Sequence, residues 1–379
     1  MTKLREVRAV ACRAPISIPL ETSFGIMRDR PMLLVRVEDT DGAVGWGEVW
    51  CNFPAVGIKH RTRLVESVIA PLLEGVDVSE PRTAFEMLVR RTRILAIQSG
   101  EPGPIAQSIA GVDCALWDLK ARKAGVPLFR LLGGATPAIA VYASGINPDG
   151  PQLVAAQMRD AGYRAFKLKI GFGLERDATN LRAMRAELGD GYALMADANQ
   201  AWELPQAVQA VETLAEFSLE WVEEPLRADA PPSQWGALDA RSSIPIAVGE
   251  NLGSRDAFDA AIAGHSIDVI QPDVSKWGGL SACVPIARAA IAAGKRFCPH
   301  FLGGAVGLAA SAHFLAAVGG DGRLEMDAND NPLRTFCGGA LTRVVDGTVT
   351  LDDAPGIGIE PNLRALEPYV ILDRKVALA

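Results

Sequence analysis

Several features that would place this chain in a familiar class are missing from its sequence. The six cysteines form no Cys-x-x-Cys pair, which fits a reducing cytosol. The formal net charge is −7 and there is no run of basic residues, so nucleic acid and anionic membrane surfaces are poor candidate partners. The longest apolar stretch, residues 305–318, is too short to span a bilayer and contains His313. Residues 1–10 mix charged and apolar side chains and do not resemble a signal peptide, so we expect a cytoplasmic protein.

The first part of the chain predicts an α+β unit. With 379 residues and 49% hydrophobic residues the chain can bury a sizeable core. Residues 33–37 and 44–48 alternate as strands and are joined through Asp41-Gly42, a hairpin signal. Polar, glycine-containing loops are expected at 21–30 and 51–57, and helices over about 60–74, 81–97 and 104–124. Strands followed by helices indicate a unit of about 130 residues.

From about residue 138 the pattern changes to short apolar strands that alternate with alanine-rich helices. The strands are expected near residues 139–144, 164–170, 193–197, 219–223, 245–250, 268–273, 296–300 and 322–325. Eight such units predict an α/β fold of the (β/α)-barrel type. A doubly wound open sheet is the alternative, but no Gly-x-Gly-x-x-Gly follows the first strand to favour it.

The second of these strands carries two lysines on one face. Period-two alternation places Phe166, Leu168 and Ile170 on one side and Lys167 and Lys169 on the other. The two lysines would lie about 6.7 Å apart along the strand. At an effective dielectric constant of about 20 their repulsion is about 2.5 kcal/mol, which predicts a pKa lowered by roughly 1–2 pH units for one of them. Such a lysine is a candidate base; a solvent-facing edge strand with two exposed lysines is the alternative.

A polar residue stands at the end of each strand from the second onward. The steps between these residues are 23 to 28 positions, about one βα unit, so they should share the C-terminal rim where barrel enzymes hold their catalytic residues. The set consists of Lys169, Asp197, Glu223, Glu250, Asp273, His300 and Glu325.

Three of the rim residues suggest a metal site. Asp197, Glu223 and Glu250 come from consecutive strands, and converging carboxylates repel one another unless a cation lies between them. An all-oxygen set suits Mg²⁺, with Mn²⁺ next, better than zinc. The alternative is that these acids cap the helices that follow them. His300 and Asp273 stand on neighbouring strands, so the carboxylate could orient the imidazole.

With these motifs in place, the chain resembles the mandelate racemase subgroup of the enolase superfamily. The resemblance covers nearly the whole length and is carried by residues 108–118, 167–169, 197–199, 222–225, 249–251, 271–273, 299–300 and 324–325. It implies an α+β capping domain over residues 1–133 and a (β/α)7β barrel over 134–335. A C-terminal segment, 336–379, would return to the capping domain. The two predicted loops would then close over the barrel mouth.

The resemblance also implies roles for the site residues. Lys169 is one acid/base, with Lys167 lowering its pKa, and His300 paired with Asp273 is the other. Mg²⁺, or possibly Mn²⁺, is held by Asp197, Glu223 and Glu250, and a protonated Glu325 stabilises the enolate. Asn199 lies beside metal and substrate, and Arg28 in loop 21–30 is a candidate substrate contact.

These roles predict Mg²⁺-dependent removal of the proton α to a carboxylate through an enediolate. The substrate is expected to be an acid sugar or its lactone, and the reaction a dehydration or a cycloisomerisation. A racemase or epimerase of a 2-hydroxy acid is the alternative enzyme, and a non-catalytic carboxylate-binding protein of the same fold is the alternative from another class. We expect a homo-oligomer that binds a small hydroxycarboxylate.

Overall fold

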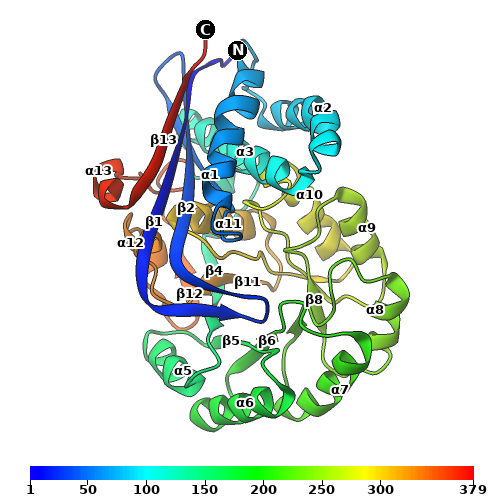
Figure 1. Ribbon diagram of the computed structural model, residues 1–379. Helices are drawn as coiled ribbons and strands as arrows, with labels where there is room; N and C mark the ends of the chain where they lie inside the picture. The colour runs from blue at the N-terminus through cyan, green and yellow to red at the C-terminus, as the bar shows by residue number, and fades with distance from the viewer.

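The structure is a computed structural model that describes residues 1–379. Its first sheet is antiparallel, with the strand order β13-β1-β2-β3. The strands are β1 (Leu4–Thr22), β2 (Gly25–Asp39), β3 (Val44–Val49) and β13 (Val370–Ala377). The hairpin predicted from residues 33–37 and 44–48 is confirmed by the β2–β3 ladder. The C-terminal strand β13 lies beside β1 in Figure 1 and pairs with it in antiparallel orientation.

The second sheet is a nearly closed barrel of eight parallel strands, ordered β10-β9-β8-β7-β6-β5-β4-β11. Each predicted barrel strand has its counterpart in the structure. They are β4 (Ala138–Ile146), β5 (Ala165–Lys169), β6 (Ala193–Asp197), β7 (Val222–Glu223), β8 (Ile246–Val248), β9 (Val269–Ile270), β10 (Arg296–Phe297) and β11 (Arg323–Asp327). A short antiparallel strand, β12 (Thr348–Thr350), pairs with β4. The predicted α/β barrel with a cap is therefore confirmed, and the open-sheet alternative is excluded.

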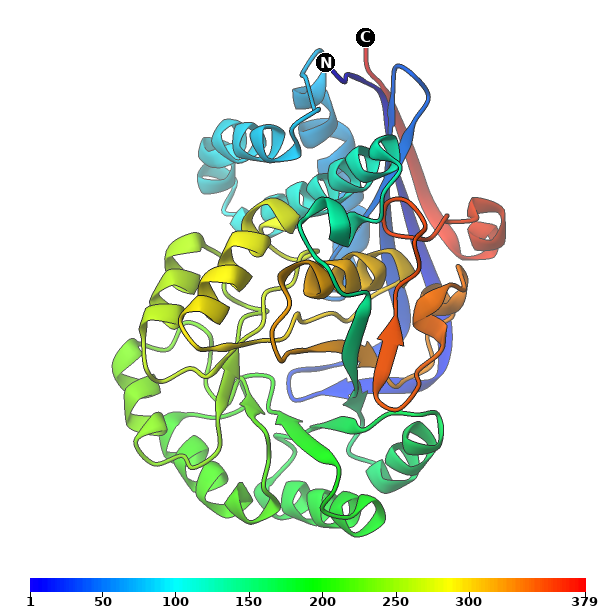
Figure 2. The same cartoon turned by 180° about the vertical axis from the view of Figure 1, so that it is seen from behind.

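Helices surround both sheets. In the first unit α1 (Gly57–Leu64) continues through a π-helical and a 3₁₀ turn to Leu73, followed by α2 (Pro81–Ser99) and α3 (Pro102–Ala124). The helices that cover the outside of the barrel in Figures 1 and 2 are α5 (Pro151–Asp160), α6 (Leu174–Leu188), α7 (Leu204–Leu214), α8 (Pro232–Asp239), α9 (Arg255–Ala263), α10 (Gly279–Ala292) and α11 (Ala305–Val318). Short helices are α4 (Leu128–Leu131), α12 (Pro332–Thr335) and α13 (Leu363–Leu366). No helix is long and apolar enough to cross a membrane.

The antiparallel sheet with α1–α3, called the cap below, is buried on both faces. Leu33 and Val35 pack toward the helices of the cap, whereas Met32 and Leu34 on the alternate face join the core shared with the barrel. On β3, a Cβ atom at Gly47 would lie 2.0 Å from the carbonyl oxygen of Gly111 on α3. Only glycine permits this close approach of helix and strand.

Two buried acids of the cap bind the first turns of two barrel helices. Glu48 accepts hydrogen bonds from the amides of Gly304 (2.6 Å) and Gly307 (2.9 Å) at the start of α11. Asp113 accepts from the amide (2.9 Å) and the hydroxyl (2.6 Å) of Ser281 at the start of α10. Burial raises the pKa of both carboxyl groups to about 7, against the opposing effect of these donors. The cap is thereby fixed to the helices whose neighbouring loops carry Asp273 and His300.

The prediction of a loop over residues 21–30 is wrong. This segment is the end of a long hairpin, in which Leu20 pairs with Met27, Glu21 with Ile26 and Thr22 with Gly25 across a two-residue turn. Backbone pairing satisfies the amide groups there, and polar composition did not prevent it. The hairpin lies across the barrel in Figure 1, and Ser23 at its tip donates a hydrogen bond to the carbonyl of Asn199 (2.9 Å). The loop predicted at 51–57 is present over residues 51–56, since Gly57 begins α1.

A buried ion pair joins this hairpin to the last barrel strand. Arg30 on β2 contacts Asp327 on β11 at 2.5 Å, and the two side chains are 1% and 2% exposed. Asp327 also accepts a hydrogen bond from the amide of Asn329 (2.9 Å), so both of its carboxylate oxygens have a partner. Breaking such a pair leaves one charge buried without compensation.

We expect Arg30→Met to lower the free energy of unfolding by about 3–5 kcal/mol, because Asp327 then lacks its counter-ion. Urea unfolding followed by circular dichroism measures this. Arg28→Met is the matched control, since Arg28 lies on the same strand but is exposed, and should change stability by less than about 0.5 kcal/mol. Arg30→Met combined with Asp327→Asn should lose less than the two single losses together. Additive losses would contradict the ion-pair account.

Candidate active site

The polar residues predicted at the strand ends all lie at the C-terminal end of the barrel. Lys167 and Lys169 are on β5, and Glu325 is on β11. Asp197 and Glu223 end β6 and β7, and Glu250, Asp273 and His300 follow β8, β9 and β10. The side chains are between 0% and 11% exposed. Their mutual contacts form a continuous buried network.

The two lysines of β5 are held by carboxylates. Lys169 Nζ lies 2.6 Å from Asp197 Oδ2 and 2.9 Å from Asn199 Oδ1. Lys167 Nζ lies 2.6 Å from Glu223 Oε2 and 2.8 Å from Glu325 Oε1. The strand is buried along its whole length, which excludes the solvent-facing edge strand.

The prediction that repulsion lowers the pKa of a lysine is wrong. Burial does oppose the charge of both ammonium groups. The carboxylates of Glu223 and Glu325 nevertheless raise the pKa of Lys167 well above its ordinary value, and Asp197 raises the pKa of Lys169. The charge of Lys167 does lower the pKa of Lys169, as predicted, but this effect is weaker than that of the Asp197 carboxylate.

His300 lies among three acids on the other side of the site. Its Nδ1 is 2.8 Å from Asp273 Oδ2, the predicted pair, and its Nε2 is 3.2 Å from Glu250 Oε2. Burial alone would lower the pKa of His300, but Glu250, Glu325 and Asp273 outweigh it and raise the pKa to about 10. The ring is therefore an imidazolium at neutral pH.

The charges around Glu325 favour its ionised form, contrary to the predicted protonated acid. Burial favours its neutral form, but the ammonium of Lys167 and the imidazolium of His300 lower the pKa of the carboxyl group to about 2. Ser144 Oγ and the amide of Phe301 also donate to it. Glu325 thus acts here as the counter-ion shared by Lys167 and His300.

The three predicted metal ligands are each paired with a lysine. Asp197 contacts Lys169, Glu223 contacts Lys167, and Glu250 contacts Lys276 at 3.0 Å. No group of three His, Cys, Asp or Glu side chains is gathered around a common point in this conformation. A cation would have to displace ammonium groups before these carboxylates could converge.

The donor set nevertheless fits a hard divalent cation. Glu223 Oε1 is buried and has no hydrogen-bond partner, and its other oxygen accepts from Gln271 Nε2 at 2.8 Å. Burial raises the pKa of Glu223 to about 7, with Asp197 and Glu325 adding to the shift. A buried carboxylate with one oxygen that accepts no hydrogen bond is an environment that a hard cation stabilises.

Sequence reasoning missed some of the contacting residues. Lys276 follows Asp273 by three positions and Gln271 precedes Asp273 by two, all in the segment after β9, so their spacing could have indicated both. Ser144 on β4 carried no such signal. Arg28, proposed as a substrate contact, is exposed on β2 and stays a prediction, whereas the buried arginine of that strand is Arg30.

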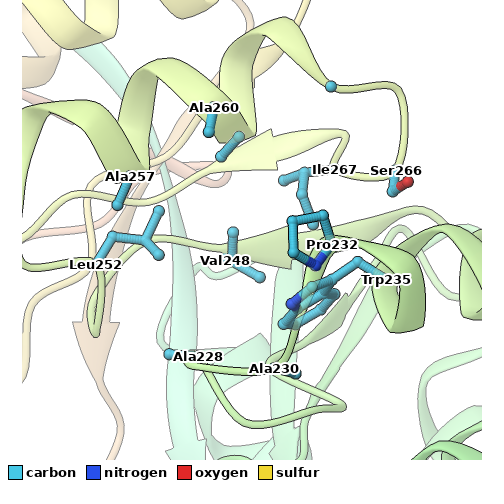
Figure 3. Close-up of a pocket in the computed structure, with 12 residues that line it drawn as sticks. Ala228, Ala230, Pro232, Trp235, Val248, Leu252, Ala257, Ala260, Ser266 and Ile267 are labelled. Atoms are coloured by element: carbon cyan, nitrogen blue, oxygen red, sulfur yellow. The ribbon is translucent and has the colours of Figure 1, made fainter.

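A separate pocket on the barrel wall is not part of this site. It lies between α8 and α9, has a volume of about 240 Å³ and is lined largely by apolar side chains (Figure 3). Trp235, Pro232 and Leu252 surround it, and Ser266 is its polar side chain. It contains no titratable group and so offers no acid–base chemistry.

These features define a class of α/β-barrel protein: a capped barrel whose strand ends carry a lysine, a histidine–aspartate pair and three carboxylates. Comparison with known protein families identifies the family within this class. Residues 4–133 match the mandelate racemase/muconate lactonizing enzyme N-terminal domain, and residues 152–365 match the enolase C-terminal domain-like family. The chain belongs to the mandelate racemase/muconate lactonizing enzyme family of the enolase superfamily.

Relatives with assigned activities act on sugar acids. D-galactarolactone cycloisomerase from Agrobacterium fabrum is 31% identical, over 98% of this chain and 100% of its own length. The 3,6-anhydro-alpha-L-galactonate cycloisomerase from Streptomyces coelicolor is 32% identical, over 94% and 96%. Arabinonate dehydratase from Saccharolobus solfataricus is 28% identical, over 90% and 92%. Both cycloisomerases and a dehydratase are thus represented.

Solved structures agree with the fold. A mandelate racemase/muconate lactonizing enzyme from Bordetella bronchiseptica superposes with a TM-score of 0.92 at 52% identity, covering 97% of this chain and 99% of its own. A racemase from Streptomyces coelicolor, solved with bound magnesium, gives a TM-score of 0.86 at 29% identity, covering 97% and 100%.

In metal-free protein we expect His300 to remain doubly protonated up to about pH 9, because Glu250, Glu325 and Asp273 raise its pKa to about 10. Nitrogen-15 NMR can follow its ring, since the chain has four histidines. Asp273→Asn should lower the pKa of His300, and His265→Asn, which alters an exposed histidine, should leave it unchanged. A His300 ring that is neutral at pH 7 would contradict the charge network.

Proposed function

We propose that the protein removes the proton α to the carboxylate of an acid sugar or of its lactone, by way of an enediolate, in a Mg²⁺-dependent reaction. The products would be those of dehydration or cycloisomerisation. One observation carries the proposal: Lys169 at the end of β5 and His300 after β10 flank the arc of Asp197, Glu223 and Glu250 in the barrel order. Two proton-carrying side chains on opposite flanks of an acidic arc suit proton removal on one face of a substrate and proton delivery on the other.

Asp197, Glu223 and Glu250 would hold the Mg²⁺, with Asn199 beside it. When bound, the ion would neutralise the substrate carboxylate and stabilise the second negative charge that develops on it. The unpartnered Glu223 oxygen supports this assignment, as does the bound magnesium in the related racemase structure. Mn²⁺ would be a functional substitute.

Lys169 would be the base for the α proton. Lys169 can accept the α proton only as a neutral amine, and the contact with Asp197 favours its charged ammonium form. Once Asp197 binds the metal ion instead, the charge of the adjacent Lys167 would favour the neutral amine of Lys169. Lys167 itself would stay charged between Glu223 and Glu325, where it faces the charge of the enediolate.

His300 would be the acid. Its Nε2 carries a proton toward the carboxylate arc while Asp273 holds Nδ1, so the ring can protonate a departing β-oxygen or the enediolate carbon. Return of the proton to the α-carbon would make the protein a racemase or epimerase, which is the second candidate because both flanks carry such a group. A protein that only binds carboxylates would not need a buried lysine base.

Metal removal tests the first part of the proposal. Dialysis against a chelator should abolish turnover of an aldonate, aldarate and lactone panel, and Mg²⁺ should restore it. Mg²⁺ at 100 times its dissociation constant should also stabilise the chelated protein by about 2.7 kcal/mol, measured by thermal unfolding. Glu223→Gln should lose this stabilisation and Glu74→Gln, at an exposed position, should retain it. Full turnover without metal would exclude the assignment.

Solvent deuterium exchange at the α-carbon separates the two proton carriers. Lys169→Ala should lose both exchange and product, because the base is gone. His300→Asn should lose product by roughly 10²–10⁴-fold but retain exchange. The surface variant His265→Asn should behave as wild type. Exchange lost only in His300→Asn would reverse the roles, and unaffected turnover in both variants would exclude this site.

A further inference from the structure

Lys276 is a third lysine at the barrel mouth, to which the proposed reaction assigns no role. Its Nζ donates to Glu250 Oε2 at 3.0 Å and to Asn251 Oδ1 at 2.7 Å. The side chain is 13% exposed, and it lies in the loop that leads from β9 to α10. The ammonium is therefore bound directly to a proposed metal ligand but remains near solvent.

The cap provides the other side of this lysine's surroundings. Lys276 Nζ lies 4.5 Å from the centre of the Trp50 ring, a cation–π distance. Trp50 is the residue that follows β3, and its amide donates to the carbonyl of Ser275 at 3.0 Å. This backbone bond links Trp50 to the loop that carries Lys276, so the ring holds the ammonium beside Glu250.

A single carboxylate oxygen is shared between Lys276 and the histidine. Glu250 Oε2 accepts from Lys276 Nζ at 3.0 Å and lies 3.2 Å from His300 Nε2. A divalent cation that takes this oxygen must displace the ammonium of Lys276. Asn251 and Trp50 would still keep that ammonium close to the ion.

We propose that Lys276 is a positioning residue that sets the affinity of the site for its divalent cation by competing for Glu250. The proposal rests on the proposed function, because it takes Asp197, Glu223 and Glu250 as the metal ligands. Two effects act in the same direction: the ammonium occupies a ligand oxygen, and its charge repels the incoming ion. The same charge remains on the His300 side of the mouth, where it favours entry of a carboxylate substrate.

The test is a titration of chelator-treated protein with Mg²⁺ in an isothermal calorimeter, which requires no substrate. Lys276→Met should lower the dissociation constant for Mg²⁺ at least about tenfold, because a competing unit charge a few ångströms away is gone. Lys276→Gln, neutral and polar, should tighten binding in the same way. Lys276→Arg keeps the charge and should bind Mg²⁺ within a few-fold of wild type.

Lys120→Met is the matched control. Lys120 also carries an ammonium on a carboxylate, 2.8 Å from Glu80, and lies 5.5 Å from the Trp117 ring, but on α3 of the cap. The Lys120→Met substitution should leave the Mg²⁺ affinity unchanged. If the role of Lys276 were merely structural, its replacement would weaken Mg²⁺ binding or leave it unchanged.

The outcomes separate the two proposals. Folded Lys276→Met and Lys276→Gln proteins that bind Mg²⁺ as wild type does, or more weakly, overturn the role of Lys276 and leave the proposed function standing. Wild-type protein that does not bind Mg²⁺ overturns the metal site of the proposed function, and with it the role of Lys276.

Discussion

Compensation of buried charge is the constraint on which the rest of the site depends. Five carboxyl groups, those of Asp197, Glu223, Glu250, Asp273 and Glu325, are gathered at the end of the barrel. Unpaired, each would be costly to bury. Four cationic side chains, Lys167, Lys169, Lys276 and His300, lie against them. A divalent cation would add positive charge to this network, which suits the binding of an acid.

The fold supplies the rigidity that such a network requires. Strand ends place the charged groups at one level, and buried acids of the cap bind the first turns of α10 and α11 next to them. The cap also reaches the site itself, through the Arg30–Asp327 pair on β11 and through Trp50 beside Lys276. Specificity and metal affinity can therefore both respond to the cap, although the proton-carrying residues belong to the barrel.

Much of this arrangement could be predicted from the sequence because it follows from a repeat. One βα unit occupies about 26 residues, so polar residues at that interval had to share a rim, and the strands proved correct. The protonation states could not be predicted. The spacing along β5 shows that the two lysines repel each other. The carboxylates of Glu223 and Asp197, which raise the pKa values of these lysines more strongly, come from other strands. The pKa of Glu325 is likewise lowered by residues of other strands. Lys276 was missed because the residues that it contacts, Glu250 and Trp50, are distant in sequence. The 21–30 hairpin was missed for another reason: its strands are neighbours in sequence, but their polar, glycine-containing composition is typical of a loop.

The central claim is that the three carboxylates exchange their lysine partners for one metal ion. Anomalous diffraction from a crystal soaked in Mn²⁺ tests it most directly, since the ion can be located without reference to activity. The account predicts one Mn²⁺ bound by oxygens of Asp197, Glu223 and Glu250, with Lys169 Nζ displaced from the Asp197 oxygen that it contacts at 2.6 Å. Manganese bound elsewhere, with the lysine pairs of the three carboxylates intact, would contradict it.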